Sequence, residues 1–163
     1  AQPDLLYFGG GAESKGSEFV GAVRSLDPDF PIMGADGMMQ DLLITDNGAE
    51  LVEGIYATNG TIPVAQMDSA AAAAFLAKYR ATYGKEPPPY AATSYEAMKV
   101  LLYAIEQAKE PTREGVLDAM QNLGEFSGIF GQWHFDERGD TSIPAISAMQ
   151  IQNGAWTFIK VLK

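Results

Sequence analysis

The sequence predicts an α/β fold in which a Rossmann-like parallel sheet is flanked by helices and a β-hairpin lies near the C-terminal end. Three observations carry this prediction. Short apolar runs alternate with segments of helical spacing over the first part of the chain. Helical apolar spacing then dominates residues 68–125. From residue 126 the pattern shortens to that of strands, and Asn153-Gly154 is typical of a hairpin turn.

The first part of the chain reads as strand, helix, strand, helix, strand. Residues 4–8 form an apolar run that three glycines stop, which is typical of a buried parallel strand. Apolar positions within 19–26 share one face at helical spacing, and a second apolar run follows at 30–33. A short helix is expected through 41–44, and a third strand at 52–57.

The second part is expected to begin with a connector, residues 59–67, that carries Gly60 and Pro63. Ser69 or Asp68 can cap an alanine-rich helix that ends at Gly84. Two further helices follow, one after the prolines at 87–89 with an apolar stripe from Ser94 to Ala108, and one from Thr112 with Val116, Leu117, Met120 and Leu123 facing inward. Strands are expected at 132–135, 145–152 and 155–161.

Charge and composition exclude several classes of function. The net charge of −10 repels phosphate backbones and anionic lipid headgroups, so we expect neither a nucleic-acid nor a membrane partner. With no cysteine and one histidine, the sequence predicts no metal site and no cofactor. No apolar run approaches the roughly 20 residues that span a bilayer, and no basic-then-apolar signal stands at the first residues.

Three motifs invite a catalytic or metal-binding interpretation, and each has a simpler one. The glycine-rich loop 9–16 follows a strand, but Lys15 precedes its last glycine instead of following it, which favours a tight turn over a phosphate cradle. A catalytic triad would need His134, which lies between aromatic residues in a strand pattern and is interpreted as structural. Residues 136–140 lack the alternating oxygen ligands of a calcium loop and are expected to form a solvated turn.

Asp36 stands at the carboxyl end of the second expected strand, where open α/β sheets bind ligands. Its carboxylate could receive an ammonium group, or it could cap the helix that follows, and the pattern alone leaves both open. Tyr90 and Tyr95 are likewise open between a pocket wall and the core.

Six segments, in this order, resemble the second half of the periplasmic leucine/isoleucine/valine-binding proteins, which are solute-binding proteins of ABC importers with the type I periplasmic-binding fold. They cover nearly the whole chain. The segments lie at residues 6–10, 33–37, 52–58, 75–84, 89–97 and 135–140.

The resemblance implies two lobes joined by a hinge, with an amino acid held between them. It assigns residues 1–58 to the C-terminal ligand-binding lobe, 59–67 to the hinge, 68–125 to helices of the N-terminal lobe, and 126–163 to strands that cross back between the lobes. The N-terminal half of such proteins has no match here. We therefore expect apolar surface that the missing half or a second copy of the chain covers.

The resemblance also implies the site. Asp36 matches the acidic position that binds the α-ammonium group, with Gly37 beside it, and Tyr90 matches an aromatic position that contacts the ligand's side chain. Gly11 and Ala12 stand where the family often has a ligand-packing tyrosine, so the pocket is expected to be larger or differently shaped. Glu13 or Ser14 could contribute instead, and leucine, isoleucine or valine should not be assumed as the ligand.

The function implied is capture of an amino acid or similar amphoteric solute by closure of two lobes outside the cytoplasm, in the periplasm or as an envelope lipoprotein, with delivery to ABC permease subunits. No enzymatic step is expected. The alternatives are a sensory or regulatory ligand-binding domain of the same fold and, ranked lower, a nucleotide-binding Rossmann-like enzyme.

Overall fold

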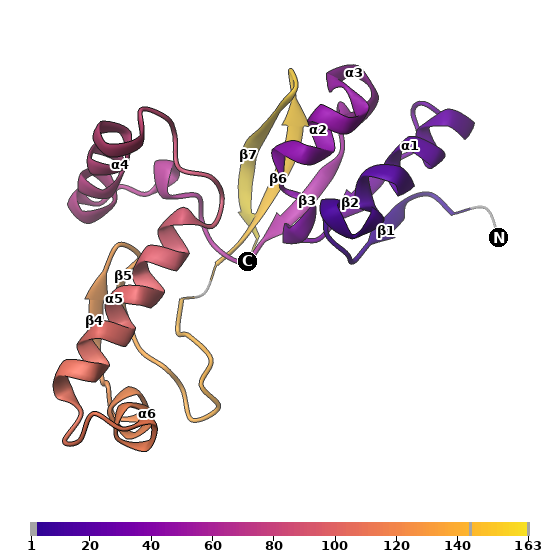
Figure 1. Cartoon of the computed structure of the whole chain (residues 1–163). Helices are drawn as coiled ribbons and strands as arrows, with labels where there is room; N and C mark the ends of the chain where they lie inside the picture. The colour runs from indigo at the N-terminus through magenta and orange to yellow at the C-terminus, as the bar shows by residue number, and fades with distance from the viewer. Residues whose placement is uncertain (1–2, 144, 163) are drawn as a thin grey trace. The chain divides into compact units, whose positions relative to one another are not determined.

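The computed structural model describes residues 3–143 and 145–162, and the chain falls into two units (Figure 1). Unit 1 comprises Ala1–Ile62 and Ala145–Lys163, and unit 2 comprises Pro63–Pro144. The first change of unit lies inside the connector expected at 59–67. The strands expected at 126–163 are divided between the two units, and the assignment of lobes stays a prediction.

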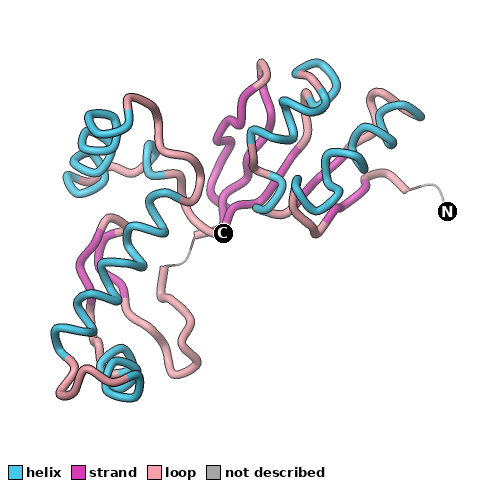
Figure 2. Tube along the Cα trace, in the orientation of Figure 1, coloured by secondary structure: helices cyan, strands magenta, loops and turns pink. Residues whose placement is uncertain are grey.

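Unit 1 is built on a mixed sheet that has five strands among the described residues (Figure 2). Its order is β1-β2-β3-β6-β7, in which β1, β2 and β3 are parallel and β6 and β7 are antiparallel to their neighbours. The strands are β1 (Leu6–Phe8), β2 (Ile32–Gly34), β3 (Tyr56–Asn59), β6 (Ile146–Gln152) and β7 (Ala155–Leu162). The expected α/β class with a parallel sheet and a C-terminal hairpin is confirmed.

Three helices and two short turns connect the parallel strands of unit 1. They are η1 (Ala12–Gly16), α1 (Ser17–Leu26), η2 (Asp36–Met38), α2 (Asp41–Asn47) and α3 (Ala49–Val52). Val20 of α1, Leu43 of α2 and Val52 of α3 are fully buried in one cluster with Ile32 and Ile151 of the sheet. The helices therefore cover one face of the sheet, and burial of their apolar faces holds this unit together.

The strand expected at 52–57 begins later than predicted, so the predicted start is wrong. Val52 ends α3, and a turn at Gly54, whose φ is +80°, separates that helix from β3. Ile55 is fully buried and its carbonyl oxygen accepts a backbone hydrogen bond of 2.9 Å from Ile151 N across the sheet, but β3 begins only at Tyr56. The apolar run thus includes a helix end and a turn as well as a strand.

The hairpin between β6 and β7 turns at Asn153-Gly154, as expected. Both residues have positive φ, +53° and +72°, which is the backbone of the mirror-image turns that match the twist of paired strands. The carboxylate of Glu53 accepts hydrogen bonds from the backbone N–H of Asn153 at 3.0 Å and of Gly154 at 3.3 Å. This side chain, from the turn before β3, fixes the hairpin tip.

Unit 2 consists of helices beside a small two-stranded sheet. The elements are η3 (Val64–Gln66), α4 (Ala70–Tyr83), α5 (Ala91–Gln107), α6 (Arg113–Gln121), β4 (Phe126–Gly128) and β5 (Gly131–Trp133). The predicted caps of α4 are confirmed: Ser69 Oγ accepts from Ala72 N at 3.1 Å, and Gly84 adopts the left-handed conformation. Helix α6 starts near Thr112 as expected, and Thr112 Oγ1 caps it by accepting from Gly115 N at 3.1 Å.

Helix α5 has a buried face and an exposed apolar face. Ala92, Glu96, Val100 and Ala104 are buried within the unit. The predicted stripe lies elsewhere on the helix, and four of its large side chains are exposed: Met98, Leu101, Leu102 and Ile105. Leu117 of α6, expected to face inward, is 53% exposed, whereas Met120 and Leu123 pack around Val100, Phe126 and Trp133.

Candidate functional site

The carboxyl ends of β1 and β2 lie side by side in unit 1 and bring two short loops together. Ala35 N donates to Phe8 O at 3.2 Å, so the residues that follow each strand start from neighbouring positions. These residues are Gly9 to Gly11 after β1 and Ala35 to Gly37 after β2. This is the edge of the sheet at which open α/β folds bind ligands.

Asp36 is exposed at this edge and opens the turn η2. Its Oδ1 accepts a hydrogen bond of 3.0 Å from the backbone N–H of Gly37. Among residues 3–143 and 145–162, no hydrogen bond or ion pair engages Oδ2. The carboxylate therefore caps neither η2 nor α2, whose N-terminal caps are Ala35 and Gln40, and one of its oxygens is open to a donor. Its role as the partner of an ammonium group stays a prediction.

Gly37 and Gly11 are the point at which the two loops touch. A Cβ added to Gly37 would lie 3.0 Å from the Cα of Gly11, which is closer than packed side chains normally come. A larger residue at position 37 would therefore push the loops apart. Only glycine at this position allows the loops after β1 and β2 to approach so closely.

The space beside Gly11 is occupied by Glu13. A Cβ on Gly11 would lie 3.2 Å from Glu13 Oε2, so the carboxylate stands where a side chain at position 11 would begin. Gln40 Nε2 donates to this same oxygen and also to Gly37 O at 3.3 Å. The site thus carries a second exposed carboxylate, tied to the loop after β2 by an amide.

Two of the expected site residues, Ala12 and Tyr90, are not placed with Asp36 at the exposed edge of the sheet. Ala12 is 2% exposed and belongs to the core cluster of unit 1, so its side chain is used for packing. Tyr90 stands just before α5 in unit 2 and is 40% exposed. Its place beside Asp36 stays a prediction.

Gln40 is the residue of this edge that the sequence did not reveal. It is a polar residue before a short helix, and no motif distinguishes it from an ordinary surface glutamine. Its role depends on the fold, because the carboxylate that it contacts lies 27 residues earlier in the chain.

The glycine-rich loop 9–16 forms a tight turn whose amides are used internally. The N–H groups of Ser14 and Gly16 both donate to Gly11 O, at 3.0 and 3.1 Å. Lys15 adopts a left-handed backbone with φ of +74°, and its ammonium group pairs with Glu18 at 3.1 Å. These two amides and this lysine are thus engaged within the chain instead of pointing at a common anion.

His134 and Asp136 have local partners. The His134 ring is 48% exposed, and its Nδ1 lies 2.8 Å from Glu125 Oε1. The backbone N–H groups of Asp140 and Arg138 donate to the Asp136 carboxylate, and they hold the pKa of Asp136 below its usual value. The stretch 136–140 is therefore a turn stabilised by its own amides.

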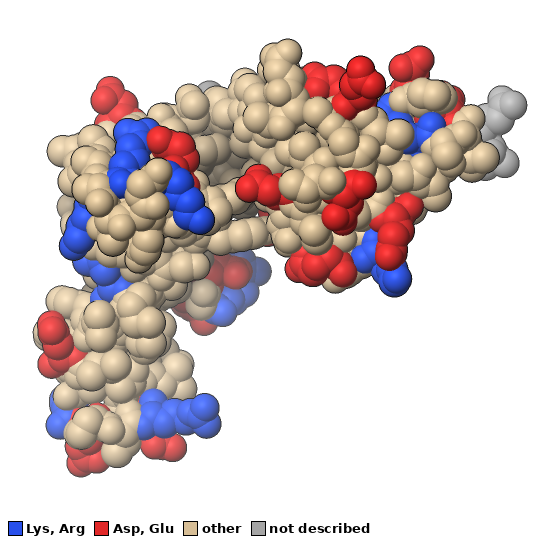
Figure 3. Space-filling model, turned by 45° about the horizontal axis from the view of Figure 1, so that its top comes forward, with Lys and Arg blue, Asp and Glu red and all other residues tan. Residues whose placement is uncertain are grey.

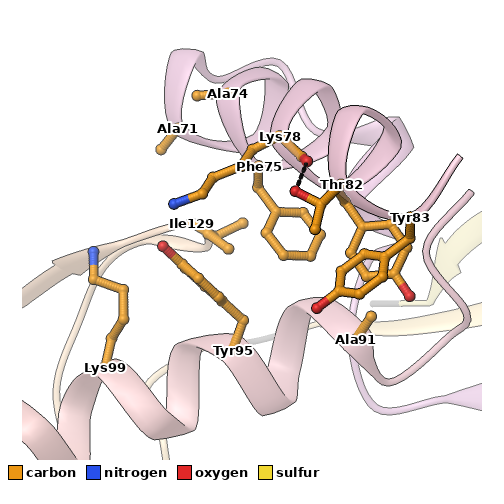
Figure 4. Close-up of a pocket in the computed structure, with 11 residues that line it drawn as sticks. Ala71, Ala74, Phe75, Lys78, Thr82, Tyr83, Ala91, Tyr95, Lys99 and Ile129 are labelled. Atoms are coloured by element: carbon orange, nitrogen blue, oxygen red, sulfur yellow. Dashed lines mark hydrogen bonds between the residues drawn. The ribbon is translucent and has the colours of Figure 1, made fainter.

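A recess lies within unit 2, between α4 and α5 (Figure 4). It has a volume of about 570 Å³ and is lined by four aromatic rings, by small and aliphatic side chains, and by two lysines. The sequence contains one signal for it, since Phe75, Tyr79 and Tyr83 are spaced by four residues on one side of a helix.

Within 3–143 and 145–162, no group of three or more His, Asp or Glu side chains is arranged to hold a metal ion. No helix in those ranges has the length and apolarity needed to cross a bilayer.

Comparison with known proteins agrees with this architecture. Leu/Ile/Val-binding protein homolog 1 from Brucella abortus and its counterpart from Brucella suis are 30% and 31% identical over 120 residues, which cover 74% of this chain and 31% of theirs. The structure is similar to that of a leucine-binding protein from Thermotoga maritima, with a TM-score of 0.85, 30% identity, and coverage of 99% of this chain and 45% of that one.

A second solved structure is similar over the whole chain. It is the branched-chain amino acid transporter substrate binding protein of Streptococcus pneumoniae in complex with isoleucine, with a TM-score of 0.83, 28% identity, and 45% of its length covered. The chain thus spans less than half the length of these relatives. Its residues 1–155 match the family described as periplasmic binding protein, and the chain belongs to that family.

Proposed function

We propose that this chain is part of the solute-binding component of an ABC importer, and that it captures an amino acid or a related amphoteric solute. Its family and the branched-chain amino acid-binding relatives support this function. The observation that carries the proposal is an exposed carboxylate, Asp36, at the carboxyl ends of parallel strands with one oxygen open.

Asp36 suits an ammonium group because a carboxylate oxygen accepts charge-assisted hydrogen bonds, which are stronger than those between neutral groups. The ligand's nitrogen would approach Oδ2, while the bond from Gly37 N holds Oδ1 and so fixes the orientation of the carboxylate. The close contact of Gly37 with Gly11 keeps this turn at the sheet edge.

A tyrosine at position 11 would pack against the ligand's side chain, but this chain has glycine there, so the ligand's side chain would contact a different surface. Gly11 provides no ring, and Glu13 with Gln40 offers a polar boundary instead. Tyr90 would supply an apolar wall, as the resemblance implies. The solute proposed here is therefore an amino acid or a related amphoteric molecule, and no particular amino acid is specified.

A second lobe would complete the site and provide the donors for the ligand's carboxylate. The exposed apolar stripe on α5 (Met98, Leu101, Leu102 and Ile105) gives one reason to expect further protein against unit 2. We propose that the portion of its relatives that this chain does not match occupies this stripe, and that a second copy of the chain is the alternative occupant.

Capture would proceed by closure of the two lobes around the solute, followed by docking to the permease subunits. No bond is made or broken, so the chain acts as a carrier and not as an enzyme. Delivery to an importer requires a location outside the cytoplasm, in the periplasm or tethered to the envelope by a lipid anchor.

Calorimetry on a two-lobed protein that contains this chain tests the proposal. Asp36→Asn should weaken binding of the best amino acid ligand by about 2–4 kcal/mol, because an ammonium group would lose its charged partner. Asp46→Asn, the same change on an exposed residue of α2, should leave the affinity unchanged and controls for net charge. Equal affinities for the wild type and Asp36→Asn would exclude Asp36 as the ammonium partner.

A further inference from the structure

The groove between α4 and α5 has the size and lining of a small-molecule site. Its volume of about 570 Å³ falls within the range of roughly 300–1,000 Å³ that is typical of ligand pockets. The residues that line it all belong to unit 2. The groove is therefore complete within one unit.

Aromatic rings form the body of the groove. The ring of Phe75 lies 5.8 Å from that of Tyr79 and 5.3 Å from that of Tyr95, measured between centroids, and Tyr79 lies 4.6 Å from Tyr83. Phe75 is 9% exposed at the floor, whereas Tyr83 and Tyr95 are 62% and 41% exposed. Flat apolar surface is thus available for a ring to stack on.

Two lysines on opposing helices give one end of the groove a positive charge. Figure 4 shows the amino groups of Lys78 on α4 and Lys99 on α5 near the hydroxyl of Tyr95, at the end away from Tyr83. Lys99 Nζ lies 6.0 Å from the centroid of the Tyr95 ring. Neither ammonium group forms an ion pair with a residue in 3–143 or 145–162.

This charge contrasts with the chain as a whole. The net charge is −10, and acidic side chains predominate on the visible face of unit 1, whereas lysine and arginine side chains gather over the α4 part of unit 2 (Figure 3). Two cations without acidic partners beside a group of tilted aromatic rings are complementary to a molecule that joins a negative group to a flat apolar body.

We propose that the groove binds a small organic anion with an aromatic body, such as an aryl carboxylate. The anionic group would accept hydrogen bonds from Lys78, Lys99 and the Tyr95 hydroxyl, and the ring would lie against Phe75 and Tyr79. A zwitterionic amino acid suits this end poorly, because its own ammonium group would face two lysines. The groove lies wholly within unit 2, and its proposed ligand does not depend on the amino acid site proposed at Asp36.

The test is calorimetry of the 163-residue chain with 1-naphthoate and with its neutral analogue 1-naphthamide. The naphthoate should bind at least about tenfold more tightly at low salt, and its advantage should shrink as salt screens the lysines. Amide chemical shifts in 70–83 and 91–107 should move on titration, with little change near Asp36. Equal binding of the two compounds, or shifts confined to the β1–β2 edge, would refute the proposal.

Two lysine variants test where the anionic group binds, and two matched lysine variants outside the groove serve as controls. Lys78→Gln and Lys99→Gln should each weaken naphthoate binding several-fold and leave naphthamide binding unchanged, because each removes one charge and little apolar surface. Lys85→Gln and Lys109→Gln remove the same charge from exposed positions of unit 2 outside the groove and should have little effect. If all four variants weaken binding alike, the effect is one of net charge and no anion site exists here.

Discussion

The buried side chain of Glu96 connects several parts of unit 2. It lies on α5 at 3% exposure, and its two carboxylate oxygens accept hydrogen bonds of 3.0 Å from Ile129 N and from Trp133 Nε1. Gly128 packs directly against this carboxylate, where any Cβ would clash. One acidic residue thus bonds the middle of a helix to the turn that follows β4 and to Trp133 of β5.

Glu96→Gln should lower the free energy of unfolding of unit 2 by about 1–3 kcal/mol, because an amide NH₂ would face a donor where a carboxylate oxygen now accepts. Urea denaturation followed by tryptophan fluorescence measures this. Glu106→Gln, on the same helix but exposed, is the control and should change the midpoint little. Identical midpoints for the two variants would show that Glu96 contributes no net stability through these bonds.

The contrast between Asp36 and Glu96 shows which side-chain positions can be predicted from a sequence. Asp36 follows a recognisable strand directly, so the position of its carboxylate at the sheet edge follows from local order. Glu96 is a charged residue in a helical pattern, and its partners lie 33 and 37 residues further along the chain. Gln40 was missed for the same reason, because only the folded chain brings it to Glu13.

Among the helices and strands, the sequence predicts the ends that a capping residue marks better than the ends that lack one. The hydroxyls of Ser69 and Thr112 and the left-handed Gly84 fix the helix ends of unit 2 through local chemistry. The start of β3 was misplaced because Val52 continues an apolar run across a helix end and a turn. The apolar stripe at helical spacing predicted helix α5 correctly. Periodicity alone could not tell which apolar face of this helix is buried among the described residues.

The β6–β7 hairpin gives a test at this scale. Gly154→Ala should destabilise unit 1 by about 1–3 kcal/mol, because a side chain at φ of +72° is strained. Its Cβ would also lie 2.9 Å from the Cβ of Ala49. Gly60→Ala is the matched control, since no atom lies within 4 Å of a Cβ there. Thermal unfolding of both variants should show a lower midpoint for Gly154→Ala alone, and equal midpoints would contradict the strain at the turn.

For the whole molecule, the two units differ in how their cores are built. Unit 1 has one large cluster in which Val20, Leu43, Val52, Ile55 and Ile151 are fully buried, and a smaller one around Met39, Ala57 and Met149. Unit 2 has two smaller clusters, one around Phe75 and Ile129 and one around Val100, Phe126 and Trp133. Because stability scales with the apolar area removed from water, unit 2 is expected to be the weaker unit.

Each unit contains one of the two tryptophans of the chain, which makes this expectation measurable. Trp156 lies in unit 1 and Trp133 in unit 2. Trp156→Phe leaves Trp133 as the fluorescent reporter of unit 2, and Trp133→Phe leaves Trp156 to report on unit 1. In urea, the Trp133 signal should change at a lower concentration than the Trp156 signal.

The two variants also check each other. Trp133→Phe removes the hydrogen bond to Glu96 and should destabilise unit 2, yet the midpoint reported by Trp156 should stay where it is if the units unfold independently. A shift of the Trp156 transition in that variant, or one common midpoint for both reporters, would mean that the chain unfolds as a single cooperative body. Independent transitions would instead indicate that unit 1, with the Asp36 edge, keeps its fold while unit 2 opens.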